Sequence, residues 1–405
     1  MMTRLAPPRD LTIPEPGSET ARAVLSAAVA KTMGQLCQLR PNMALSHWGR
    51  ARVVEIRRIC QRLKDHQVGA LASLARDPSI SVWVRCLRRP AAFIGGPGQA
   101  LSGDQLVARL LASIGYNLAL TGGLRAPVVV EGAVERLVSL NLRRAADISP
   151  GAEALRFEPG RVFERVEGKW RGLEALGDLG HKYFPAVDDD TVLALRDDNP
   201  LRLEEAHPDK EGNALDLGER SADEWLRALR GGLDLVDEFM PDVRREMRLL
   251  MRQVVPVGYD AERHLSASYQ ESIGTVYMTL HPLLMTMTEA LIHEFSHNKL
   301  NALFDVDPVI ENPPDALYTS PVRPDPRPLL GVLLAVHAFL PVARLYELMI
   351  EGGHPLAKSP VFLERFEAIK EKNHQGAELV LEHGIATPVG RGLMDEIRRW
   401  DEHFS

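Results

Sequence analysis

The chain has 405 residues, of which 45% are hydrophobic and 25% are charged, and its formal net charge is −7. These values are typical of a globular protein with one large core or two to three domains, and the acidic balance argues against a nucleic-acid surface. Aromatic residues make up only 6% of the chain, which favours an α-rich fold over a sandwich or barrel. The first 19 residues contain no apolar segment typical of export, so we expect a cytoplasmic protein.

Residues 1–125 are predicted to form a helical N-terminal region. Long segments with apolar residues at helical spacing cover residues 19–39, 51–75 and 105–120. The chain's three cysteines all fall in this region, without CxxC spacing, and we expect them to be buried free thiols of a reducing compartment: Cys37, Cys60 and Cys86.

Residues 126–255 are predicted to form a mixed α/β region. Alternating or β-branched residues predict short strands within 126–132, 155–168 and 191–195. Residues 221–253 predict a pair of helices that meet around Gly231 and Gly232, and Ser221 and Glu224 fit a capping box at the start of the first helix.

Residues 256–405 are predicted to be the catalytic region. Strands are expected at 254–258, 264–269 and 275–280, and the last two are expected to form a hairpin. A long helix follows directly. The expected fold is therefore α+β and mainly α-helical, with a small antiparallel sheet beside this helix.

The long helix contains the sequence His293-Glu294-Phe295-Ser296-His297, an HExxH motif. Residues i and i+4 of a helix lie on one face, so the two imidazoles can bind one metal ion. Glu294 is then placed to act on a bound water or ligand. A chance occurrence of this loose pattern is the alternative, but the apolar helical setting favours metal binding.

The third metal ligand is less defined. A metzincin continues with Gly and His where this chain has Leu300 and Leu303. Glu311 is a candidate of the thermolysin type, although it lies in a turn-rich segment. His337 is the other candidate, and its apolar surroundings would keep the imidazole neutral and able to bind a metal. Alternatively, His337 is a core histidine whose ring bonds a carbonyl group.

A proline-rich loop with Arg323 and Arg327 follows the motif. Stiffly held guanidinium groups bind carboxylates in a bidentate manner, although either arginine could instead pair with Asp325 or Asp315. The next helix is predicted at 328–350, with a kink caused by Pro341, and its apolar stretch of 329–343 is too short to span a membrane. Two further helices are expected near 360–383 and 389–403.

The segments HEFSHNKLNALFD, YTSPVRPDPRPLLGVLLAVHAFLPVARLYE and LRDDNPLRLEEAHPDKEG together resemble an HExxH-motif family that matures ribosomally synthesised peptides. Members of this family look like 2-oxoglutarate-dependent peptide β-hydroxylases. The resemblance implies Fe(II) bound by His293 and His297, a role for Glu294 in orienting a ligand, and the distal carboxylate of 2-oxoglutarate bound by Arg323 or Arg327. The product would be a peptide hydroxylated on a side-chain β-carbon.

One departure from that family concerns the third ligand. Relatives often carry His or Gln where this chain has Leu334, and His337, one turn further along the helix, is expected to substitute for it.

Two other functions remain open from the sequence. A zinc metallopeptidase would use Glu294 as a general base, and an inactive module would bind a peptide without chemistry. We expect a precursor peptide as partner, neither nucleic acid nor membrane, and allow for a homodimer.

Overall fold

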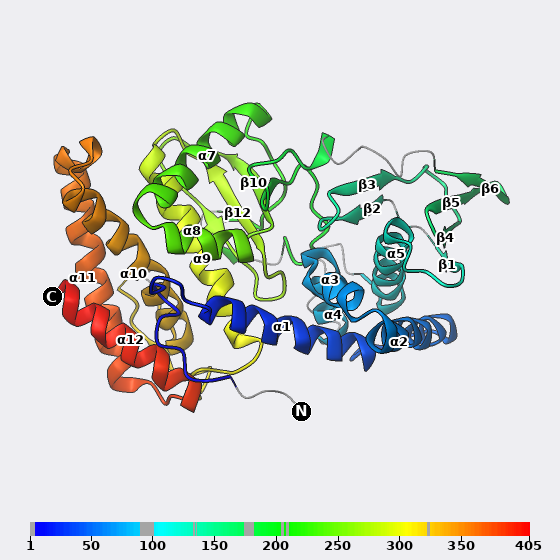
Figure 1. Cartoon of the computed structure of the whole chain (residues 1–405), viewed down its shortest axis with the longest axis horizontal. Helices are drawn as coiled ribbons and strands as arrows, with labels where there is room; N and C mark the ends of the chain where they lie inside the picture. The colour runs from blue at the N-terminus through cyan, green and yellow to red at the C-terminus, as the bar shows by residue number, and fades with distance from the viewer. Residues whose placement is uncertain are drawn as a thin grey trace.

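The computed structural model describes residues 5–89, 101–132, 134, 136–173, 182–203, 206–207, 210–321 and 325–405. Helices account for most of the described secondary structure, and the sheets are small, so the predicted α+β, mainly helical fold class is confirmed. In Figure 1 the helices and strands form two parts that lie side by side, and α1 (Thr20–Cys37) runs along beneath both.

The smaller part is built from N-terminal helices and short strands. Helix α5 packs against α2 and α4 and also against strands of the four-stranded sheet, whose order is β1-β4-β5-β6. A separate hairpin, β2-β3, also contacts α5. The elements are α2 (His47–His66), α3 (Val68–Arg76), α4 (Pro78–Arg88), α5 (Gly103–Thr121), β1 (Val128–Glu131), β2 (Arg136–Ser139), β3 (Arg144–Asp147), β4 (Ala154–Glu158), β5 (Arg161–Val166) and β6 (Lys169–Gly172).

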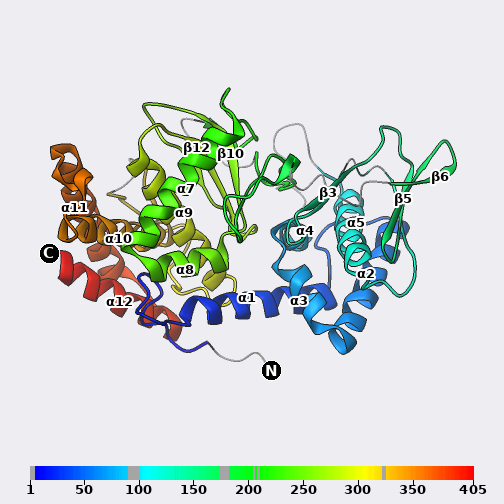
Figure 2. The same cartoon turned by 45° about the horizontal axis from the view of Figure 1, so that its top comes forward.

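The larger part contains the HExxH helix, α9. Its elements are β7 (Val192–Leu193), α7 (Ala222–Phe239), α8 (Pro241–Leu250), β10 (Gln253–Tyr259), β11 (Ser266–Ala267), β12 (Thr275–Leu280), α9 (Leu284–Phe304), α10 (Leu329–Glu351), the 3-10 turn η2 (Pro355–Lys358), α11 (Pro360–His383) and α12 (Pro388–Phe404). Two pairs of two-residue strands lie between these elements: β8 (Ala206–His207) with β9 (Lys210–Glu211), and β13 (Leu317–Tyr318) with β14 (Arg327–Pro328). Figure 2 shows the same two parts after the molecule is turned.

The sheet beside α9 differs from the prediction in one respect. Strands β11 and β12 form the expected antiparallel hairpin, but β10 runs parallel to both β12 and β7, so the sheet is mixed. Helices α7 and α8 precede β10, and the hairpin follows it. Strand β12 is buried along its whole length, which is the pattern of an interior strand with both faces covered.

The predicted break at Gly231 and Gly232 is wrong, because α7 continues through both glycines and ends before Pro241. Close packing explains the glycine at 232. A Cβ atom there would lie 2.9 Å from Cδ1 of Leu291 on α9. Glycine therefore lets α7 approach the HExxH helix closely, and Pro241 starts the next helix.

Helix α10 confirms the helix predicted at 328–350 and contains Pro341, and its 23 residues exceed the apolar stretch of 329–343 that argued against a membrane span. It is the one helix in the described part of the chain with the length and apolar composition to cross a membrane, and most of its residues are buried inside the fold. It packs between α9 and α11 as a core helix. The kink expected at Pro341 stays a prediction.

The hydrophobic cores do not follow the predicted boundaries at residues 125 and 255. One cluster joins the N-terminal segment and α1 to α7–α12, and a second joins the end of α1 to α2–α5 and the strands β1–β5. The three cysteines belong to the second cluster, and they are buried thiols that form no disulfide, as predicted. The domain division itself stays a prediction.

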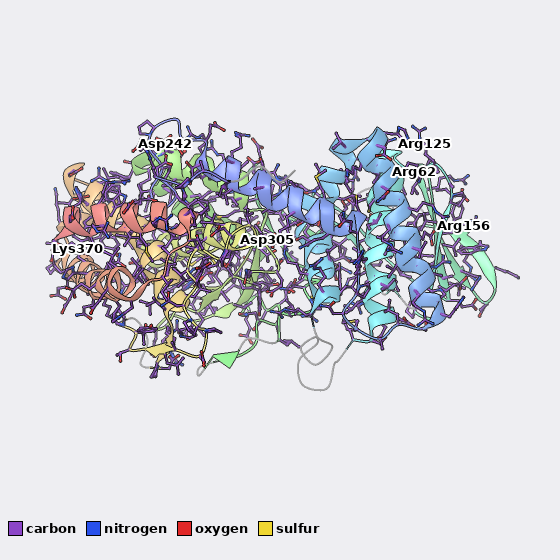
Figure 3. All side chains as sticks on the ribbon, turned by 90° about the horizontal axis from the view of Figure 1, so that it is seen from below. Arg62, Arg125, Arg156, Asp242, Asp305 and Lys370 are labelled. Atoms are coloured by element: carbon purple, nitrogen blue, oxygen red, sulfur yellow. The ribbon has the colours of Figure 1, made fainter. Side chains whose placement is uncertain are left out.

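Asp305, just after α9, connects the two parts, and Figure 3 shows it beside α1 near the middle of the molecule. Its carboxylate lies 2.8 Å from Nη2 of Arg85 on α4, and its carbonyl oxygen accepts a hydrogen bond from Lys31 on α1. The end of the HExxH helix is therefore tied to the smaller part of the molecule.

The segment before α1 is held against α12 of the larger part by a buried carboxylate. Glu396 on α12 accepts hydrogen bonds from the backbone N–H groups of Leu11, Thr12 and Ile13 at 2.8, 2.8 and 3.0 Å. Lys299 on α9 forms a fully buried pair with Glu246 at 2.7 Å and also reaches the carbonyl oxygen of Thr12.

We predict that Glu396→Ala lowers the free energy of unfolding by about 3 kcal/mol, because three buried backbone donors lose a charged acceptor. Urea denaturation measures the change. Asp395→Ala is the matched control, since its side chain is 65% exposed and bonds only the neighbouring Arg398 in the contacts described. Equal stability of the two variants would show that Glu396 does not hold the N-terminal segment.

Candidate metal site

The two imidazoles of the motif converge on the same point. His293 and His297 lie one turn apart on α9, and their Nε2 atoms are 2.9 Å apart. Two nitrogens bound to one ion at about 2.1 Å and at right angles would be about 3 Å apart. The spacing of the pair therefore fits a shared metal ion.

Burial keeps both imidazoles in the form that binds metals. It lowers the pKa of His297 to about 4 and the pKa of His293 well below its ordinary value, where the neighbouring His297 adds to the effect. Both rings are thus neutral at physiological pH, and a neutral imidazole nitrogen has the lone pair that a metal requires.

Ring packing orients the pair. The two imidazoles meet edge to face with centroids 4.4 Å apart, and Phe339 of α10 covers His293 with centroids 4.6 Å apart. The Nδ1 atoms of both rings are buried and have no hydrogen-bond partner among the described residues. Aromatic contacts, not a hydrogen bond to Nδ1, hold these rings in place.

Glu294 completes a compact group. One carboxylate oxygen of Glu294 and one nitrogen from each of the two histidines lie within 4.8 Å of one another. Glu294 is 2% exposed, and Oγ of Ser268 donates a hydrogen bond of 2.6 Å to its Oε2. A buried carboxylate beside two neutral imidazoles can orient a bound ligand or take a proton from it.

The hairpin before α9 positions Ser268. Asn298 of α9 donates to the Thr275 carbonyl at 3.2 Å and accepts from the Gly274 N–H at 2.6 Å. Gly274 has a φ of +99°, a conformation that favours glycine. These bonds fix the hairpin against α9 and place Ser268 next to Glu294.

The structure does not bring His337 into this group. His337 is fully buried, and its Nδ1 lies 3.0 Å from the hydroxyl of Thr12. Phe339, two residues later, is the residue that contacts His293, and positions two apart on a helix are rotated by about 200°. His337 is thus directed toward the N-terminal segment and has the character of a core histidine. Burial, with Lys299 next in effect, lowers its pKa well below the ordinary value.

The other predicted residues also lie apart from the group. Arg327 pairs with Asp325 at 3.3 Å and packs along Gly331 at the start of α10. Pairing with Asp325 is the alternative role that the sequence analysis left open for Arg327. Arg323 falls outside the described residues. Glu311 is exposed, and its backbone N–H bonds the Ile385 carbonyl.

A second polar cluster near the metal group was missed in the sequence. Glu289 lies one turn before His293, so the i, i+4 spacing could have indicated it. Its carboxylate accepts hydrogen bonds from the Tyr346 hydroxyl and from Nη2 of Arg365, the latter at 2.7 Å. Arg365 lies close enough to contribute to the lowered pKa of His293. The partners of Glu289 lie on α10 and α11, and no local sequence pattern connects those helices with the HExxH motif.

Comparisons with known protein families and with curated proteins found no match for this chain. Any function proposed for the chain therefore depends on this site and on the residues that support the family resemblance.

We predict that His293→Ala and His297→Ala each abolish stoichiometric metal binding, whereas His337→Asn retains it. The first two remove a ligand, and the third changes a residue that faces Thr12. Metal content after dialysis against Fe(II) or Zn(II), with folding checked by circular dichroism, measures the difference. Metal retained in the first two variants would show that the motif does not bind it.

Proposed function

We propose that this chain is a metal-dependent enzyme, and that it hydroxylates a side-chain β-carbon of a ribosomally synthesised peptide with Fe(II) and 2-oxoglutarate. The observation that supports a metal enzyme is the convergent, partly buried and neutral pair His293 and His297 beside the buried Glu294 carboxylate. The resemblance of the motif and the following loop and helix supports the particular reaction.

In this proposal His293 and His297 hold the ion. When bound, Fe(II) would supply oxidative chemistry that uses dioxygen and 2-oxoglutarate together: one oxygen atom of dioxygen would enter the C–H bond, and the other would enter the succinate formed as 2-oxoglutarate loses CO2. Glu294 orients a ligand by hydrogen bonding, and Ser268 fixes the direction of that carboxylate. Phe339 contributes an apolar wall that excludes water from one side of His293.

Two regions of the chain are candidates for binding the distal carboxylate of 2-oxoglutarate. The family resemblance favours Arg323 or Arg327. Arg365 is the alternative because its charge acts on His293, although Glu289 already neutralises part of that charge. A rigid arginine fork in either region would give bidentate recognition of a carboxylate.

A zinc peptidase is the second candidate function, and the position of Glu294 favours it. The carboxylate is adjacent to the metal group, where a general base would activate a zinc-bound water. The two candidates differ in metal and in product, and one reaction mixture distinguishes them.

We predict that the protein consumes 2-oxoglutarate only with Fe(II), and that a peptide substrate gains one oxygen atom without cleavage. Mass spectrometry of candidate peptides incubated with Fe(II), ascorbate and 2-oxoglutarate measures the product, and Glu294→Gln and His297→Ala serve as controls. Peptide fragments formed with Zn(II) instead would support the peptidase. Tight peptide binding with neither reaction would support an inactive binding module.

We predict that replacing the arginine that binds 2-oxoglutarate raises the concentration needed for half-maximal turnover by about 100-fold, and that Lys is nearly as harmful as Ala because it lacks the bidentate fork. The variants to compare at equal metal content are Arg323→Ala, Arg327→Ala and Arg365→Ala, each with its Lys counterpart. An effect confined to Arg365 would move the carboxylate site to the Glu289 cluster. Unchanged half-saturation in all of them would contradict arginine binding of the co-substrate.

A further inference from the structure

The metal group of His293, His297 and Glu294 offers two nitrogen ligands, whereas catalytic sites with open positions usually have three protein ligands. We propose that His264, in the turn before β11, supplies the third imidazole ligand through its Nε2. This inference rests on the proposed metal site of His293 and His297.

The hairpin places His264 alongside the first half of α9. Helix α9 runs back along β12, as the bonds from Asn298 to Thr275 and from Ser268 to Glu294 show. The chain before Ser268 continues next to the end of β12, because the Thr279 N–H donates to the Leu265 carbonyl at 2.8 Å. His264 is the next residue in that direction, toward the α9 segment that precedes Glu294.

The ring of His264 also has the orienting contact that metal-binding histidines usually have. Its Nδ1 lies 3.3 Å from the Thr279 hydroxyl, and its Nε2 is buried. A partner at one ring nitrogen fixes the tautomer and directs the other nitrogen to the metal. His281, whose ring centroid is 6.4 Å away, differs because its Nδ1 accepts the Leu283 N–H.

His264 lies outside the group whose atoms are within 4.8 Å of one another. Ligation therefore requires the turn at 260–264 to shift toward α9. Residues 261–263 of this turn are exposed, and Asp260 stabilises it by accepting the N–H groups of Glu262 and Arg263. A short exposed turn of this kind can move without disturbing the packed hairpin.

Electron spin-echo spectroscopy of the Cu(II)-loaded full chain tests this assignment by counting bound imidazoles. We expect three in the natural protein and two in His264→Ala, with three retained in the control His281→Gln. Loss of an orienting partner weakens metal binding by about 10–100-fold, so loss of this ligand should weaken Cu(II) and Zn(II) binding by at least about 100-fold.

Two imidazoles in the natural protein would overturn the assignment to His264 and leave the pair on α9 intact. This count does not depend on whether the His264 variant folds. Cu(II) bound with the same spectrum in His293→Ala would instead overturn the proposed metal site itself. The two failures are therefore distinguishable.

Discussion

The packing of α9 in the interior is the constraint on which the site depends. Helix α9 contacts α1, α7, α8, α10 and the hairpin, and 14 of its residues are buried. Gly232 permits the close approach of α7, and Phe339 of α10 closes over His293. The two imidazoles are partly buried by the same packing, and the loss of solvent around them lowers their pKa, so both rings are kept in the neutral form that can bind a metal.

Charged groups on the other sides of α9 are paired with groups on neighbouring helices. Lys299 is fully buried against Glu246, whereas Glu289 is held by Tyr346 and Arg365 nearer the surface, where the Arg365 side chain is partly exposed. A buried charge without its partner would be costly, so these pairs fix how α9 is rotated about its axis. That rotation determines which side chains face the metal group and directs His337 toward Thr12 instead.

Local patterns predicted the helices and the convergent histidines because i, i+4 spacing is a property of one helix. The same reasoning failed where partners come from distant segments. His337 was expected at the metal because it lies in an apolar helix. The direction of its side chain depends on how α10 packs against α9, and in the structure Phe339, not His337, contacts His293. Ser268 and Arg365 carried no signal, since a serine at the end of a predicted strand and an arginine on a late helix are ordinary residues. The parallel pairing of β10 with β12 was also missed, because a strand pattern does not state its direction.

The most direct measurement of the central claim is X-ray absorption at the metal edge of the loaded protein, compared with the His293→Ala/His297→Ala double variant. The account predicts a site with imidazole nitrogen and oxygen neighbours, without sulfur, that disappears in the double variant. A sulfur neighbour, or the same spectrum in the double variant, would place the metal elsewhere and contradict the assignment of His293 and His297.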